Sequence, residues 1–598
     1  MKNIVLFSIF GILAIVFGFF QFDNLLIDLY TKTVYYFHSV TLLLWIFCVF
    51  KILLFNNEEQ FEKKVLLTKF KSFFEYHWFA VMLSIFVMVF GIFACKPDFR
   101  ILADETNLVS DSQMLYEKRE CYIVYSSLNI NLGEKRLIRI GIDKRPAFFP
   151  YLLSLVHSVL GYKAENVFIL NFVFGVLSLF LIYYLIQIYK GRFWGICGLC
   201  CLSAYPIFLL YANSAGFDLF NMFCSLVLLV LIYRFIKQPK ASFAEVLLLW
   251  LPIIGQSRYE SILSVFIVLP LIFYWLPKSE YLKLSYKTWI FPLLLLPSAW
   301  LFRITSDPSF WQINSLDEGF GLSWLYDNTI QSFVYFLSGE EAYGVIPVLS
   351  IFGIIGFMIF ILDVFRKESE LSFGGLDKTS SRLFVGSFIL FYFLHAIAKF
   401  SYSWTDFTDV IISRQSLIFL PFIIIMAIHF LSECNKKYGL KKSYCALSAV
   451  FLLFFYWPDA GNNCGVKTNE LHNEFKEGRK YLRANFPNKN DYICIVERPG
   501  LFVPLGYSAI SFNSDLPNPK NENSDKTKEE YKQNNLKLIV DFYKRKICSY
   551  FILIQNIDKK TNEPLFALPD GFKEEVLCEY QFYRERLLRF SKITIVDN

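Results

Sequence analysis

Stretches of apolar residues recur from the N-terminus to Trp457, and most are close to the length that a helix needs to cross a membrane. A spanning helix takes about 20 residues, because the hydrocarbon layer is about 30 Å thick. We predict about 13 crossings on this basis. Their approximate ranges are 4–22, 34–55, 76–95, 167–188, 193–212, 217–236, 243–255, 262–276, 289–302, 343–365, 383–400, 416–431 and 444–457. The chain is therefore predicted to be a polytopic α-helical membrane protein, and its 55% content of hydrophobic residues agrees.

The orientation follows from where lysine and arginine lie between these ranges. With the N-terminus in the cytoplasm, the inside loops hold most of the basic residues, as the positive-inside rule requires. These are Lys63, Lys64, Lys69, Lys71, Lys190, Arg192, Arg234, Lys237, Lys240, Lys278, Lys283, Lys287, Arg366, Lys367, Lys378, Arg382, Lys436, Lys437, Lys441 and Lys442. The formal net charge of +7 therefore needs no nucleic-acid partner, and we predict none.

This orientation places three segments outside the cytoplasm: residues 96–166, residues 303–342, and everything after Trp457. The first ends in "RPAFFPYLLSLVHSVLGY", whose apolar core is too short to span and suits a helix lying along the membrane surface. We predict a multi-pass protein of the plasma or inner membrane.

The last outer segment, 458–598, differs in composition from the rest. "NELHNEFKEGRKYLRANF" predicts an amphipathic helix, while "DYICIVE" and "SYFILIQNI" predict short buried strands. We therefore expect a C-terminal extracytoplasmic α/β domain over 458–598.

The thirteen cysteines show no spacing that suits a structural zinc site. Those in outer regions could form disulfides if the compartment is oxidising, although the sequence assigns no pairing. They are Cys95, Cys121, Cys464, Cys494, Cys548 and Cys578.

Charged residues gather where the apolar ranges meet the outer face, beginning with the acid pair in "RILADETNLVSD". The set comprises Asp104, Glu105, Asp143, Lys144, Arg145, Asp218, Arg258 and Arg414. Acids and bases at one depth describe a site that could hold an anionic headgroup and activate a nucleophile. Taken singly, Lys144 or Arg145 could instead be an interfacial anchor, and Asp218 could be a helix cap.

The order of these features resembles GT-C glycosyltransferases, most of all the branch of protein O-mannosyltransferases and lipid A aminoarabinose transferases. Their acid pair is similar to Asp104-Glu105, and their Lys-Pro-Pro segment is similar to "DKRPAFFPYLLSL". Lys144 stands at the lysine, but Arg145 replaces the first proline. Asp218 in "LLYANSAGFD" resembles their acid at a helix start.

Arg414 followed by Pro421 resembles a late motif of the same families, with Gln415 in place of its tyrosine. The resemblance covers 76–457, which implies a GT-C-like catalytic transmembrane domain with an outer loop at 96–166. Residues 1–75, two helices and a cytoplasmic loop, look like an addition. The C-terminal domain also resembles the bacterial members.

The resemblance implies transfer of a sugar from a polyprenyl-phosphate donor to an acceptor on the extracytoplasmic face, with inversion at the sugar carbon. Asp104 is then the general base, and Glu105 a supporting residue in the catalytic pair. The cations Lys144, Arg145, Arg258 and Arg414 are expected to hold the donor phosphate, because arginine binds phosphate oxygens in pairs.

Asp218 and Asp143 are expected either to hold a divalent metal ion or to orient these basic groups. The acceptor, a glycolipid, a glycan or a protein, stays open.

Two other functions remain as alternatives, a membrane transporter or flippase and a glycan polymerase of the cell envelope. A transporter would need polar residues or broken helices near the middle of the membrane. The charges of this chain collect at one face, which favours surface chemistry.

Overall fold

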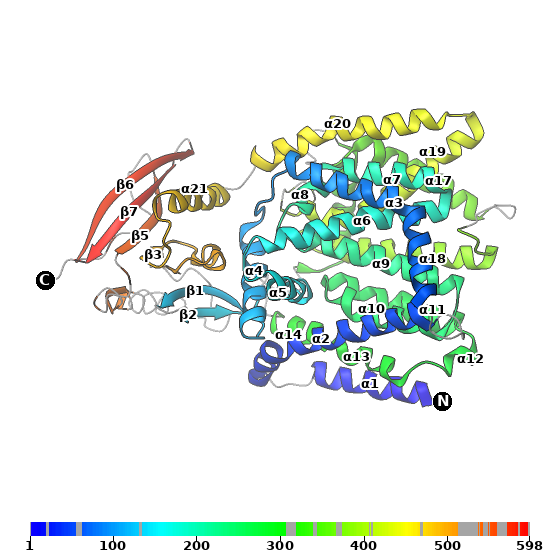
Figure 1. Ribbon diagram of the computed structural model, residues 1–598, viewed down its shortest axis with the longest axis horizontal. Coiled ribbons are helices and arrows are strands. Elements are labelled where there is room, and N and C mark those ends of the chain that lie inside the picture. The colour runs from blue at the N-terminus through cyan, green and yellow to red at the C-terminus, as the bar shows by residue number, and fades with distance from the viewer. Residues whose placement is uncertain are drawn as a thin grey trace.

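The structure is a computed structural model. It describes residues 2–19, 23–55, 63–130, 134–306, 319–338, 344–365, 373–405, 407, 409, 411–466, 470–511, 550–558, 571–583 and 586–595, with a few single residues between 536 and 568. A bundle of helices and a β-sheet lie end to end, and helices α4 (Leu102–Glu117) and α5 (Phe148–Leu160) stand at the junction (Figure 1). The predicted surface helix corresponds to α5.

The bundle contains the long apolar helices. It is built from α1 (Lys2–Phe19), α2 (Asp23–Phe55), α3 (Lys63–Ala94), α6 (Asn166–Lys190), α7 (Arg192–Ala204), α8 (Pro206–Ala212), α9 (Asp218–Lys237), α10 (Ala241–Gly255), η1 (Tyr259–Ser264), α11 (Val265–Trp275), α12 (Lys278–Tyr281), η2 (Tyr286–Ile290), α13 (Phe291–Leu294), α14 (Leu296–Ile304), α16 (Ser323–Leu337), α17 (Pro347–Phe365), α18 (Lys378–Phe400), η4 (Ser413–Phe419), α19 (Leu420–Tyr438) and α20 (Lys442–Val466).

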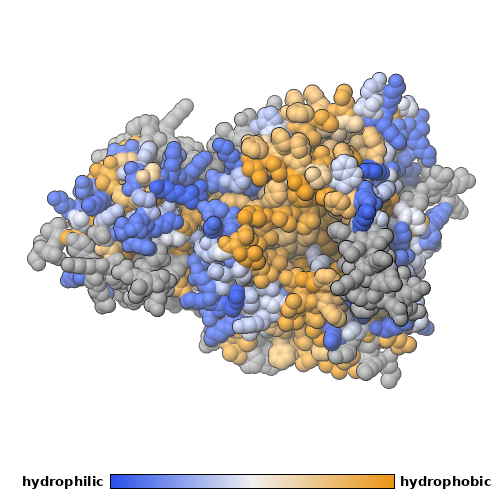
Figure 2. Space-filling model, viewed as in Figure 1, coloured by the Kyte–Doolittle hydropathy of each residue, from blue (hydrophilic) through white to orange (hydrophobic). Residues whose placement is uncertain are grey.

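Within the described ranges, seven helices are long and apolar enough to cross a membrane, or eight if α7 and α8, bent by 74°, form one span. The other predicted crossings contain shorter or broken helices, such as α10 and α11. On the face shown in Figure 2, apolar residues cover most of the bundle and hydrophilic ones lie toward its two ends. The protein is thus a polytopic membrane protein, and the number of crossings stays a prediction.

Among the described residues, the sheet has seven strands in the order β2-β1-β4-β3-β5-β7-β6. The strands are β1 (Ile123–Ile130), β2 (Glu134–Gly141), β3 (Tyr492–Ile495), β4 (Ala509–Ile510), β5 (Tyr550–Asp558), β6 (Phe572–Tyr583) and β7 (Arg586–Ile595). Strand β3 pairs in parallel with β4 and β5, and the remaining pairs are antiparallel. Helix α21 (Glu470–Asn485) packs on the sheet, with the ring of Tyr481 4.2 Å from that of Phe590. The predicted helix and two strands are therefore present.

Two of the strands come from the loop at 96–166 rather than from the C-terminal segment. Strands β1 and β2 form a hairpin between α4 and α5, and Ser127 of β1 pairs with Ala509 of β4. The sequence analysis placed no strand in this loop. Because β2 ends at Gly141, the sheet leads directly into the segment that carries Asp143, Lys144 and Arg145.

Candidate active site

Asp104 and Glu105 stand in the first turn of α4, where the partial positive charge of a helix N-terminus stabilises carboxylates. Successive helical residues point about 100° apart, so the two side chains leave α4 in different directions. Asp104 keeps 19% of its side chain exposed, whereas Glu105 is fully buried. The predicted acid pair therefore divides into one accessible carboxylate and one enclosed carboxyl group.

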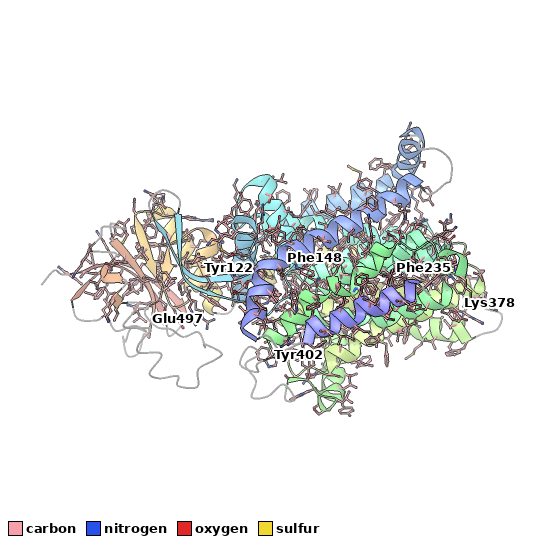
Figure 3. The ribbon with its side chains drawn as sticks, turned by 90° about the horizontal axis from the view of Figure 1, so that it is seen from below. Tyr122, Phe148, Phe235, Lys378, Tyr402 and Glu497 are labelled. Carbon is pink, nitrogen blue, oxygen red and sulfur yellow. The ribbon has the colours of Figure 1, made fainter. Side chains whose placement is uncertain are left out.

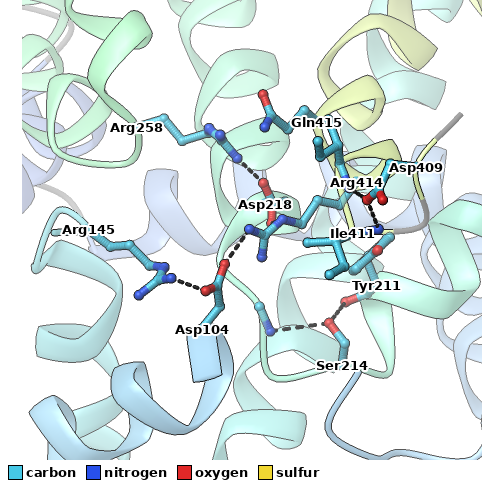
Figure 4. A network of polar contacts seen from close by, with 12 residues as sticks. Asp104, Arg145, Tyr211, Ser214, Asp218, Arg258, Asp409, Ile411, Arg414 and Gln415 are labelled. Carbon is cyan, nitrogen blue, oxygen red and sulfur yellow. Dashed lines mark hydrogen bonds and ion pairs between the residues drawn. The ribbon is translucent and has the colours of Figure 1, made fainter. Parts of the chain in front are cut away.

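Two arginines hold the Asp104 carboxylate, one at each oxygen (Figure 4). Arg145 donates from Nη2 to Oδ1, and Arg414 donates from Nη2 to Oδ2. Arg145 lies just before α5 and Arg414 lies in η4, ahead of α19. Three segments far apart in the chain thus meet at this carboxylate.

Two further acids, Asp143 and Asp218, also contact Arg145 and Arg414. Asp143 accepts from Nη1 of Arg145 at 2.6 Å. Asp218, the first residue of α9, accepts from Nη1 of Arg258 and lies 3.5 Å from Nε of Arg414. The result is one continuous network of alternating acids and arginines.

The network continues beyond the residues that the sequence analysis named. Glu260, in η1, has its Oε1 atom 2.9 Å from Nε of Arg258 and 2.5 Å from Nζ of Lys399. Lys399 also donates to Oε1 of Gln415 at 3.4 Å. Both have a signal in the sequence: Glu260 stands two positions after Arg258, and Lys399 lies near the end of an apolar range, where a charge is costly unless paired.

The charges around Asp104 set its acidity. Burial raises the pKa of the Asp104 carboxyl, but Arg145 and Arg414 outweigh burial and hold that pKa well below its ordinary value. Asp104 is therefore ionised at neutral pH. In this arrangement it is also a weak base, because a proton would have to displace two guanidinium contacts.

Glu105 lies apart from the network and faces the turn before α9. Its Oε2 atom accepts from the backbone N–H of Arg100 at 2.7 Å, and a Cβ placed on Gly216 would lie 3.5 Å from its Oε1 atom. That turn is fixed by Ser214, whose Oγ donates to the Tyr211 carbonyl and accepts from the Gly216 N–H (Figure 4). Burial raises the pKa of Glu105 to about 7, against the opposing effect of the Arg100 N–H.

Lys144 borders the network. Its Nζ atom lies 5.9 Å from the centre of the Trp404 ring, and its carbonyl accepts from the hydroxyl of Tyr259. Burial lowers the pKa of Lys144, as does the charge of Arg145, while Asp104 opposes both. Lys144 therefore adds a positive charge next to the accessible carboxylate.

The acids present do not fit a divalent metal ion. Asp143 and Asp218, the residues considered for a metal, both hold arginines. Among the described residues, no group of three or more histidine, cysteine, aspartate or glutamate side chains is arranged to ligate one. A metal would have to share its ligands with guanidinium groups, so we derive no step through one.

The network brings together most of the predicted site residues, namely Asp104, Asp143, Arg145, Asp218, Arg258 and Arg414. Lys144 borders it, and Glu105 lies apart from it. The chemical roles of all eight stay predictions.

Comparison with known families agrees with the motifs. Residues 144–301, about a quarter of the chain, match the family model described as dolichyl-phosphate-mannose-protein mannosyltransferase. The matched range holds Lys144, Arg145, Asp218 and Arg258. This match agrees with the predicted resemblance to GT-C glycosyltransferases, and it supports glycosyltransferase activity for this membrane protein. No curated protein matches the sequence.

Three solved structures are similar to this chain. ArnT from Cupriavidus metallidurans, bound to undecaprenyl phosphate, is 10% identical with a TM-score of 0.48, covering 86% of this chain and 98% of its own. AglB from Archaeoglobus fulgidus, an oligosaccharyltransferase in complex with an inhibitory peptide and a dolichol-phosphate, is 9% identical with a TM-score of 0.43, covering 82% and 70%. The arabinosyltransferase EmbB from Mycobacterium smegmatis is 11% identical with a TM-score of 0.32, covering 64% and 40%. All three TM-scores lie below 0.5, so these likenesses do not by themselves establish a shared fold.

Proposed function

We propose that this protein transfers a sugar from a polyprenyl-phosphate donor to a hydroxyl or phosphate of an acceptor on the extracytoplasmic face. Asp104 is the general base, and the sugar carbon is inverted. Arg145, Arg258 and Arg414, with Lys144, bind the donor phosphate. The acceptor is a glycolipid, a glycan or a protein.

The observation that carries this proposal is the position of Asp104 among the arginines. Asp104 is the most exposed member of the network, and Arg145 and Arg414 contact it directly from two other segments. A group transfer from phosphate needs a base and a cationic phosphate site close together. Both requirements meet at one carboxylate.

A phosphate-linked donor is supported by the charges and by the matched family. The network joins four carboxylates to four cations, and Lys144 beside it leaves one net positive charge when every group is ionised. One positive charge suits a phosphodiester, which carries one negative charge, better than it suits a diphosphate. The name of the matched family also specifies a sugar on a polyprenyl phosphate, dolichyl-phosphate mannose.

In the reaction, the acceptor oxygen attacks the sugar carbon on the face opposite the phosphate. A new C–O bond forms, the bond between the sugar carbon and the phosphate oxygen breaks, and the acceptor proton moves to Asp104. The arginines stabilise the negative charge that develops on the departing polyprenyl phosphate. Because phosphate is already a good leaving group, no second carboxylic acid is required.

The same arginines connect donor binding to the basicity of Asp104. A donor phosphate that contacts Arg145 and Arg414 shares their charge, which weakens the two contacts that keep the pKa of Asp104 low. Asp104 can then accept a proton more readily. Donor binding thus precedes proton transfer in this scheme.

The extracytoplasmic location of the site is supported by charge and by cysteine chemistry. Basic residues are concentrated in the loops at the other side of the bundle. Cys95, between α3 and α4, is disulfide-bonded, and disulfides persist in oxidising compartments. Both point to an N-terminus in the cytoplasm and a sheet outside the plasma or inner membrane.

The test is to supply the purified full chain, in lipid nanodiscs, with polyprenyl-phosphate sugars and candidate acceptors. The proposal predicts release of polyprenyl phosphate and a glycosylated acceptor. Movement of the intact donor across a bilayer without cleavage would instead favour a transporter or flippase.

A further inference from the structure

Glu260 and Lys399 form an ion pair in the network that takes no part in the proposed reaction. Lys399 lies at the end of α18, and only 2% of its side chain is exposed. Lys378 and Tyr402, labelled in Figure 3, lie at opposite ends of the bundle, so α18 brings Lys399 to the end that faces the sheet. A buried lysine needs a close partner, because an unpaired charge there is strongly destabilising.

That partner, Glu260, also fixes one edge of Arg258. Glu260 Oε1 lies 2.9 Å from Nε of Arg258, while Asp218 accepts from Nη1 of the same guanidinium. The carbon at the centre of this guanidinium, Cζ, lies 5.2 Å from the centre of the Phe217 ring. Two carboxylates and one ring therefore determine the orientation of the Arg258 guanidinium.

Lys399 has a distinct effect on the charge that Arg258 can offer. Arg258 contacts the carboxylates of Asp218 and Glu260, and Arg414 shares the Asp218 carboxylate. Without Lys399, Arg258 would have to neutralise the Glu260 carboxylate by itself. With Lys399 on Glu260, each of these carboxylates is shared between two cations. The positive charge of Arg258 thus stays available to an anion.

We propose that Glu260 and Lys399 are positioning residues that hold the Arg258 guanidinium in the orientation in which it binds the donor phosphate. This inference rests on the proposed function. Neither residue touches the reacting atoms in it. Their contribution is to donor affinity, and the bond-breaking step depends on Asp104.

The competing explanation is that Glu260 and Lys399 only neutralise each other's charge inside the protein and do not affect donor binding. The double variant Glu260→Gln with Lys399→Met separates the two explanations, because it removes one negative and one positive charge and leaves no buried charge unpaired. Glu260→Gln alone removes the carboxylate on Lys399, and Lys399→Met alone leaves the Glu260 carboxylate with Arg258 as its ion-pair partner. Each single variant therefore unbalances the buried charges, and we expect both to unfold at a lower temperature than the double variant.

A second, partly buried pair provides a control. Lys190 and Glu433 are 3.0 Å apart, with 18% and 17% of their side chains exposed. Lys190 ends the 25-residue helix α6, whose other end follows α5 at the junction. The double variant Lys190→Met with Glu433→Gln makes the same chemical changes away from the candidate site.

The experiment measures polyprenyl phosphate binding and transfer kinetics separately for the parent and both double variants in nanodiscs. We expect the Glu260→Gln, Lys399→Met variant to bind polyprenyl phosphate about tenfold more weakly, because Arg258 loses its fixed orientation. Its KM for the donor should rise by a similar factor with kcat nearly unchanged, while the control variant matches the parent.

Equal binding and equal KM in the parent and the Glu260→Gln, Lys399→Met variant would overturn the positioning role. A fall in kcat alone, at unchanged donor affinity, would overturn it as well. If the parent binds polyprenyl phosphate but cleaves no donor, the proposed function fails. The comparison of binding between the parent and the double variant then still tests whether Glu260 and Lys399 position Arg258.

Discussion

Arg414 donates to Asp104 although 310 positions separate them in the chain. Arg145 occupies the other oxygen of the same carboxylate. The cations proposed to bind the donor phosphate are therefore already bound to an anion of the protein. A phosphate that enters the site must compete with the Asp104 carboxylate for both guanidinium groups.

The first prediction concerns this competition. Asp104→Asn removes the resident negative charge, so we expect polyprenyl phosphate to bind about tenfold more tightly, since like charges brought together oppose binding. The affinity is measured by titration of the variant in nanodiscs. Asp98→Asn is the control, because Asp98 is 18% exposed and pairs with Arg479 outside the network. Equal or weaker binding by Asp104→Asn would show that the carboxylate does not compete.

The second prediction concerns Arg414, which contacts both Asp104 and Asp218. Arg414→Gln should weaken polyprenyl phosphate binding by roughly ten- to a hundredfold, the usual effect of losing a hydrogen bond to a charged group. Arg414→Lys should recover only part of the loss, because lysine keeps the charge but cannot contact two oxygens in a fixed plane. Complete recovery in the lysine variant would show that charge alone is sufficient.

The third prediction concerns the buried carboxyl group of Glu105, whose pKa is raised to about 7 by burial. The folded protein then binds a proton that the unfolded chain has released, so stability falls as pH rises from about 4.5 to about 7. Glu105→Gln lacks this group, so the variant should gain relative to the parent with increasing pH, by up to about 3 kcal/mol at pH 8. The readout is the unfolding temperature of both proteins between pH 5 and pH 8. Glu165→Gln, at a half-exposed side chain, serves as the control. A difference that does not change with pH would contradict the prediction.

Much of the site could be predicted because topology restricts where charges can lie. Asp104, Arg145, Asp218 and Arg414 all fall close to ends of apolar ranges that the predicted topology places on one side of the membrane, and a membrane forces such ends to one depth. The direction of Glu105 could not be predicted in this way, because it depends on the rotation of α4 about its axis. The sequence places two acids side by side but does not say which one faces the arginines.

Contacts between distant segments were also out of reach. Glu260 and Lys399 are 139 positions apart, and each alone resembles an ordinary charge at a membrane surface. The place of the β1–β2 hairpin in the sheet could not be predicted for the same reason, since it depends on the pairing of Ser127 with Ala509. Strand pairing over such a separation leaves no local pattern.

The fourth prediction concerns the connection between the sheet and α4. The short helices η5 (Pro499–Leu501) and η6 (Val503–Leu505) pack against α4, and Val503 is fully buried. Val503→Asp buries an unpaired charge beneath the helix that carries Asp104, so we expect loss of transfer and faster proteolysis. Val576→Asp makes the same change in β6 at a side chain that is 50% exposed. It should behave like the parent. Equal activity of both variants would show that α4 does not depend on this contact.

The most direct test of the account is the rate of sugar transfer by Asp104→Asn at saturating polyprenyl-phosphate donor. Asparagine keeps the shape of the side chain but cannot accept the acceptor proton. We predict a fall of about 10²- to 10⁴-fold relative to the parent, the usual contribution of a general base, with Asp98→Asn unaffected. Undiminished transfer by Asp104→Asn would contradict the assignment of Asp104 as the base.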